Sequence, residues 1–199
     1  MKRPYELKQR AEARDHTRLK IVEAAIRLHQ KQGIAATSML DVATEAGVGK
    51  VTVYRHFPDL DAMTGACSGL YFERNLPPDP RSWSDIADPA ERLYKGLHDT
   101  YAWFKMTKDM MNAVYSELRN KPLMVPYHDH WELLTETLLA PWVNVLNGDV
   151  KQMALLRAAI ALALDFDTWR TLTQAHKLTD EDAADLMSRM ISGNLPNAQ

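Results

Sequence analysis

The sequence predicts an all-α protein with a small N-terminal helical domain and a larger helical domain, about nine helices in total. Three observations lead to this expectation. Apolar residues recur at intervals of three and four along most of the 199 residues. Glycines and prolines interrupt that pattern where helices would end. No segment alternates convincingly between apolar and polar residues, as a half-buried strand does.

Charge is distributed unevenly along the chain. The formal net charge is −2, with 46% hydrophobic and 25% charged residues, which is ordinary for a globular protein. Residues 1–56 hold 11 Lys and Arg against 6 Asp and Glu, whereas the remainder holds 13 against 20. A basic end on an acidic body favours attraction to phosphates at that end only. The alternative is a chance imbalance.

The single cysteine, Cys67, excludes an intramolecular disulfide framework and a cysteine-rich zinc site. It is typical of a reducing compartment, so we expect a cytoplasmic protein. The charged N-terminus indicates no signal peptide. The most apolar run, residues 153–164, is interrupted by Arg157 and is too short to cross a bilayer, so we expect no membrane association.

The chain begins with a polar segment followed by a helix. Residues 1–14 are rich in Lys and Arg, and we expect a flexible basic arm there. A helix is predicted over 15–32, because Ile21 and Ala25 lie on one apolar stripe and Gly33 follows. Touching a DNA minor groove or phosphates is one role for such an arm; a solubilising tail is the other.

Two short helices joined by a tight turn come next. Ser38 is a favoured N-cap residue, and Gly47 can end a helix because glycine adopts the left-handed conformation without a Cβ penalty. A third helix can then run from Lys50 to Phe57, since no proline intervenes before Pro58. Residues 15–57 therefore have the arrangement of a three-helix helix-turn-helix DNA-binding domain.

The third helix has two different faces. Val53 and Phe57 share the apolar face, which can dock on a core. The opposite face carries side chains that suit base edges and phosphates. We expect contacts with double-stranded DNA from this helix and from the start of the helix before it: Thr37, Ser38, Lys50, Val51, Thr52, Tyr54, Arg55 and His56. The alternative is an ordinary short amphipathic helix with a solvated face.

The stretch from Arg18 to Met63 resembles the DNA-binding domain of TetR-family transcriptional regulators. Its most specific parts are A-T-E-A-G-V over residues 43–48 and T-V-Y-R-H-F over residues 52–57. The resemblance implies a homodimer that binds a palindromic operator as a repressor. It also implies a small-molecule effector that releases the protein from DNA. Leu40 and Leu60 depart from the polar or basic residues common in the family. A helical ligand- or protein-binding module with weakened or lost DNA affinity is therefore the alternative function.

Helices are expected to continue to the C-terminus. A linking helix is predicted over 58–74, with Asp59 as its cap, and a proline-rich loop over 75–87 opens a ligand-binding and dimerisation domain over 75–199. The spacing of apolar residues predicts further helices over 88–106, 108–118, 131–146 (with a bend at Pro141), 149–176 and 179–192.

The last two helices are apolar on more than one face, so one face needs a partner. The resemblance implies that this partner is the same helix pair of a second subunit. The expected dimer-interface residues are Leu155, Ala159, Leu162, Phe166, Met187 and Met190. A wholly internal core helix is the alternative.

Aromatic residues and methionines are frequent in the larger domain, and helix bundles build ligand sites from facing side chains. We expect an apolar or aromatic effector to bind near Tyr101, Phe104, Met111, Tyr115, Trp131, Asp165 and Trp169. No phosphate-binding glycine loop or metalloprotease motif occurs, so we predict no catalysis and no cofactor. The only dense polar cluster is His128-Asp129-His130, where we expect no metal.

Overall fold

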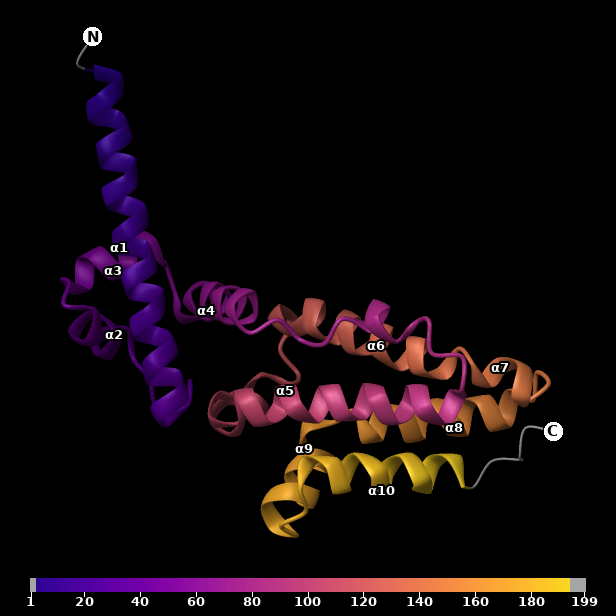
Figure 1. The fold of residues 1–199 in the computed structure, drawn as a ribbon. Helices are drawn as coiled ribbons and strands as arrows, with labels where there is room; N and C mark the ends of the chain where they lie inside the picture. Colours follow the sequence, from indigo (N-terminus) through magenta and orange to yellow (C-terminus); the bar gives the residue numbers. More distant parts are fainter. Residues whose placement is uncertain (1–2, 194–199) are drawn as a thin grey trace. The chain divides into compact units, whose positions relative to one another are not determined.

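The structure of the protein is a computed structural model that describes residues 3–193 (Figure 1). Every regular element within this range is a helix, which confirms the all-α prediction. By contacts between residues the chain forms two compact units. The first comprises the chain up to Leu76 together with Asp109–Leu123; the second comprises Pro77–Lys108 and the chain from Met124 onward. The predicted arm's first two residues and the last six of the chain lie outside the described range.

The first helix is longer than predicted. Helix α1 covers Arg3–Gln32, so most of the segment expected to be a flexible arm is helical. Two features explain this correction. Pro4 stands in the first turn, where its missing N–H costs nothing, and the residues after it are mainly Ala, Glu, Gln, Lys, Arg and Leu, which favour helices.

The next three helices begin and end close to the predicted residues. Helix α2 (Met39–Ala46) is capped by Ser38 and ends at Gly47, whose φ of 62° is left-handed. Helix α3 (Lys50–His56) follows after the turn. Helix α4 (Leu60–Arg74) starts at Asp59, whose carboxylate accepts from the Ala62 N–H at 2.7 Å.

A single apolar core joins these helices. Val53 and Phe57 of the α3 segment are 0% and 1% exposed. Their neighbours in the core come from α1, α2 and α4: Ile21, Val22, Ala25, Met39, Val42, Met63 and Cys67. Each large side chain buried in this way contributes roughly 1.5–3 kcal/mol. The orientation of α3 is therefore fixed by its inner face.

Helix α5 covers Pro89–Leu118 without a break, which corrects the predicted interruption near residue 107. No glycine or proline stands at that point. The Thr107 hydroxyl donates to the Trp103 carbonyl at 2.8 Å, so its hydrogen bond is made within the helix. The last part of α5 belongs to the first unit, where the Glu117 carboxylate accepts from the Ala35 N–H at 2.7 Å and the Ile34 N–H at 3.2 Å.

The remaining elements differ from the prediction in where helices break. The helix expected over 131–146 begins earlier, because Pro126 can occupy the first turn, and it ends before Pro141. The helix expected over 149–176 is divided at Asp165, whose carboxylate caps a new helix. The elements are η1 (Pro80–Trp83), η2 (Pro122–Met124), α6 (Val125–Leu139), α7 (Trp142–Val145), α8 (Val150–Ala163), α9 (Phe166–Arg170), a π-helical turn η3 (Thr171–Ala175) and α10 (Asp180–Ser192), the last as predicted.

An aromatic cluster forms the core of the second unit. The Phe104 ring centroid lies 5.3–6.0 Å from those of four neighbours: Trp103, Trp131, Phe166 and Trp169. Rings at these separations attract one another in addition to the area they bury. The cluster links α5, α6 and α9 within this unit.

Candidate nucleic-acid interface

Helix α3 presents one face to the core and one to solvent. Val53 is fully buried, whereas Val51 is 72% exposed and Tyr54 is 45% exposed. Lys50 and Arg55 are also exposed. The outer face therefore combines an isopropyl group, a phenol, an ammonium and a guanidinium, which can meet base edges and phosphates without moving the helix. Thr52, which is half-buried, lies at the margin of this face.

Short-range contacts hold the exposed side chains in place. The Lys50 ammonium lies 5.8 Å from the centre of the Tyr54 ring, and the Arg18 guanidinium lies 4.7 Å from that of Phe57. Both are cation–π contacts. The first links two of the predicted DNA-contact residues, and the second ties α1 to the end of α3.

Thr37 is buried in the turn that follows α1. Its side chain is 3% exposed, and its hydroxyl donates to the Gly33 carbonyl at 2.7 Å. Threonine commonly makes such hydrogen bonds to the backbone in turns. The hydroxyl therefore stabilises the turn, and the phosphate contact of Thr37 stays a prediction.

Ser38 is exposed and makes a reciprocal cap with Asp41. The Ser38 hydroxyl donates to the Asp41 carboxylate at 2.6 Å, and the Ser38 N–H donates to the same oxygen at 2.8 Å. These side-chain and backbone hydrogen bonds hold the pKa of Asp41 below its usual value. The pair fixes the first turn of α2, the helix that precedes α3 in the helix-turn-helix.

His56 is half-buried at the end of α3, among cationic groups. Burial lowers the pKa of His56 below its ordinary value, and the charges of Arg14, Arg18 and Arg55 lower it further, while Asp15 opposes them. The imidazole is therefore neutral near pH 7 in the protein without DNA. Arg14 and Arg18 were not predicted as site residues, although their spacing of four places them on one side of a helix.

The residues expected to bind an effector belong to both compact units. Tyr101, Phe104, Trp131 and Trp169 belong to the aromatic cluster of the second unit, whereas Met111 and Tyr115 lie in the first unit. Three polar atoms of the cluster donate within the chain: Tyr101 Oη to the Ala163 carbonyl, Trp131 Nε1 to the Leu164 carbonyl and Trp169 Nε1 to Asp180, each at 2.9 Å. Asp165 caps α9. The effector site stays a prediction.

The residues expected at a dimer interface fall into two groups. Leu155 and Leu162 of α8 and Met190 of α10 are 56%, 62% and 55% exposed, and Ala159 is half-buried. In contrast, Phe166 is fully buried and Met187 is 9% exposed inside the chain. These two side chains belong to the core of the second unit and do not form part of its surface.

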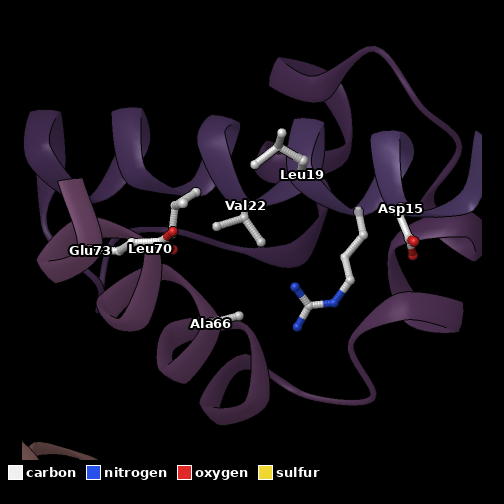
Figure 2. A pocket seen from close by; sticks show the side chains of 7 residues that line it. Asp15, Leu19, Val22, Ala66, Leu70 and Glu73 are labelled. Carbon is white, nitrogen blue, oxygen red and sulfur yellow. The ribbon is translucent and has the colours of Figure 1, made fainter. Parts of the chain in front are cut away.

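An open groove lies within the first unit between α1 and α4 (Figure 2). Its volume is about 350 Å³. The lining residues are Asp15, Arg18, Leu19, Val22, Ala66, Leu70 and Glu73. Apolar side chains form its middle and charged ones its ends, as is usual at the margin between two packed helices.

Residues 3–193 contain neither a candidate metal cluster nor a candidate membrane-spanning helix. In that range, no group of three or more His, Cys, Asp or Glu side chains could hold a metal ion. The ring of His130 instead contacts the Pro78 carbonyl at 2.9 Å. No helix in the same range is long and apolar enough to cross a membrane.

Residues 21–67 match the family described as bacterial regulatory proteins, tetR family. One curated relative is an uncharacterised HTH-type transcriptional regulator, YerO, from Bacillus subtilis. It is 28% identical over 100 residues, which cover 49% of this chain and 35% of the relative. The chain thus spans about a third of the length of this relative.

Two solved structures have a similar fold. A TetR-like transcriptional regulator from Rhodococcus sp. RHA1 matches with a TM-score of 0.61 and 18% identity, over 88% of this chain and 93% of that chain. NalD, the secondary repressor of the MexAB-OprM multidrug efflux pump in Pseudomonas aeruginosa, matches with a TM-score of 0.56 and 16% identity, over 94% and 100% of the respective chains. At these identities the likeness shows a shared fold.

A helix-turn-helix with a solvent-facing second helix, followed by further helices, is the arrangement that this chain shares with these solved structures. Within this arrangement, residues 21–67 are similar to the tetR family of bacterial regulatory proteins.

Proposed function

We propose that the protein is a homodimeric, ligand-responsive repressor that binds a palindromic operator with one α3 in the major groove of each half-site. It acts in the cytoplasm and performs no catalysis. The observation that carries the proposal is the outward display of Val51, Tyr54 and Arg55 on a helix whose inner face is locked in the core.

The exposed apolar face of α8 supports the homodimer. Leu155 and Leu162 lie seven residues apart on one side of this helix, and both are more than half exposed. Large apolar side chains gathered in this way are typical of surfaces that associate. A twofold dimer would set its two recognition helices about 34–36 Å apart, which is one turn of DNA.

Repression and its release by a ligand form the last part of the proposal. The related fold of NalD, described as a repressor of an efflux pump, supports repression. An effector would release DNA only through a different affinity for the DNA-bound and free conformations. A hydrophobic or aromatic compound would bind next to the aromatic cluster around Phe104, whose rings form the buried core of the second unit.

The test is selection of bound duplexes from a random pool, followed by a salt series on the selected sequence. A palindromic consensus with half-sites one turn apart is expected. Binding should weaken steeply as salt rises, because phosphate contacts release counterions. Failure to enrich any sequence, with no retention on duplex DNA at low salt, would reject the proposal.

The second candidate is a helical binding module with weakened DNA affinity, and Leu40 and Leu60 favour it. Leu40 is 56% exposed on α2, where it offers no charge to a phosphate. Leu60 packs against the core of the first unit. Substituting Leu40→Arg separates the two candidates. If the wild type is a repressor, it already binds the operator, and Leu40→Arg increases its affinity modestly. If the wild type has lost DNA binding, only the Leu40→Arg variant binds.

A further inference from the structure

The N-terminal half of α1 segregates its charges. Arg10, Arg14 and Arg18 follow one another at intervals of four and lie along one side of the helix. Glu12 and Asp15 lie on another side, where Glu12 pairs with Lys8 at 3.9 Å. All of these side chains are exposed. We call the three arginines the α1 stripe.

The α1 stripe lies on the same side of α1 that enters the core farther along. Ile21 and Ala25 continue its line at helical spacing, and both are fully buried. The stripe is thus an outward extension of the face that packs on the other helices of this unit. In Figure 1 the N-terminal half of α1 extends past α2 and α3.

Contacts at its inner end place the α1 stripe beside the recognition helix. Arg18 stacks on the Phe57 ring, directly after α3. Arg14 and Arg18 both act electrostatically on His56, together with Arg55 of α3 itself. The positive surface of α3 and that of the stripe therefore meet at the C-terminal end of α3.

We propose that the α1 stripe is a rigid helical arm that binds backbone phosphates of DNA next to the half-site held by α3. This inference rests on the proposed function and adds a second contact surface to it. From Arg18 to Arg10 the stripe spans about 12 Å of helix axis, and one strand of DNA places a phosphate about every 3.4 Å. The stripe can thus follow several phosphates, which fixes register without reading sequence.

The test compares salt dependence of operator binding in two double variants of the full chain. Arg10→Ala with Arg14→Ala removes the outer part of the stripe, leaving Arg18 on Phe57. Lys8→Ala with Lys31→Ala removes the same charge from exposed positions of α1 outside the stripe. The slope of log K against log salt should become shallower by about 0.9 for each lost phosphate contact, so about 1.8 per protomer, in the first variant only.

A third variant tests the helical form of the arm. Ala11→Pro keeps every charge but disrupts α1 between Arg10 and Arg14. A rigid arm loses the Arg10 contact, so the slope becomes shallower by about 0.9 per protomer. A slope equal to that of the wild type would mean that the segment binds as a flexible tail, and would overturn the proposal.

The outcomes separate this inference from the proposed function. Equal slopes for the wild type and the Arg10/Arg14 variant on the selected operator overturn the α1 stripe and leave the repressor intact. If the slope becomes equally shallow in the Lys8/Lys31 control, the effect comes from net charge alone, and the α1 stripe is again overturned. A wild type that binds no duplex overturns both.

Discussion

The exposed residues of α3 differ in what they can do on DNA. The Val51 side chain offers only apolar surface, which suits a thymine methyl group, whereas Arg55 can reach guanine or a phosphate. Tyr54 lies beside Lys50 and is 45% exposed. A side chain positioned in this way loses little freedom on binding, so Tyr54 is the residue at which the proposed docking can be tested with least disturbance to the fold.

Replacing Tyr54 by alanine should weaken operator binding by roughly tenfold, in line with the 1–3 kcal/mol typical of one good contact. The thermal midpoint should hardly change, because the side chain is 45% exposed. Fluorescence anisotropy and calorimetry measure the two effects. Val53→Ala is the matched control on the buried face, and it should lower stability by about 2 kcal/mol. Unaltered affinity in Tyr54→Ala would mean that α3 does not dock as proposed.

His29 makes the first unit sensitive to acid. Its ring is 3% exposed, and Nε2 has no hydrogen-bond partner. Burial lowers the pKa of His29, although the Glu117 carboxylate acts in the opposite direction. In the unfolded chain the pKa of the ring is about 6.5. Below that pH the unfolded state takes up a proton before the folded state does, so the free energy of unfolding falls.

Urea unfolding should therefore show lower stability at pH 5.5 than at pH 7.5, with the loss confined to the range below about 6.5. His29→Leu should flatten this dependence, since leucine fills the site without a titrating group. His176→Leu, at an exposed position, is the control and should leave it unchanged. The hypothesis fails if His29→Leu retains the full pH dependence.

At the scale of elements, the turn after α1 depends on a distant helix. Gly33 has a φ of +82°, and a Cβ added there would lie 2.6 Å from the Glu117 carboxylate. That carboxylate accepts from the backbone N–H groups of Ile34 and Ala35. The loop between α1 and α2 is thus closed by a residue more than 80 positions along the chain.

Glu117→Ala should lower the free energy of unfolding by about 1–3 kcal/mol, because it leaves two backbone N–H groups without their acceptor. Gly33→Ala should also destabilise the protein through its positive φ and the close approach. Because Glu117→Ala removes the clashing atom, the double variant should lose less stability than the two single variants together. Simple additivity in denaturant unfolding would show that the two residues act independently.

Local signals predicted helix α2 and the starts of α3, α4 and α10, because caps such as Ser38, Asp59 and Thr179 act within one turn. They did not predict the break at Asp165. The apolar spacing continues across it, and the hydrogen bond from the Asp167 N–H to the Asp165 carboxylate marks the start of a new helix. Spacing alone also could not tell that Phe166 packs inside the chain, since a helix apolar on several faces gives the same pattern for core and interface.

At the scale of the whole molecule, the proposed binding of a palindromic operator requires two copies of the chain, one for each half-site. The described surface offers α8 for this contact, because Val150, Leu155 and Leu162 are 81%, 56% and 62% exposed on one helix. Arg157 lies on the opposite side of the same helix, where it forms ion pairs with Glu132 and Glu136 of α6. The face that carries Leu155 and Leu162 is therefore free of this charge.

Leu162→Glu places a carboxylate at the centre of this face and should convert the dimer into a monomer, because burying the charge against a second copy is costly. The monomer should keep its helix content, since the native side chain is 62% exposed. Operator affinity should fall by at least about 100-fold, the gain that joining two binding modules provides. Sedimentation and anisotropy measure the two effects. Met106→Glu, on α5 and 61% exposed, is the control and should change neither. A Leu162→Glu dimer with undiminished operator affinity would place the subunit contact elsewhere.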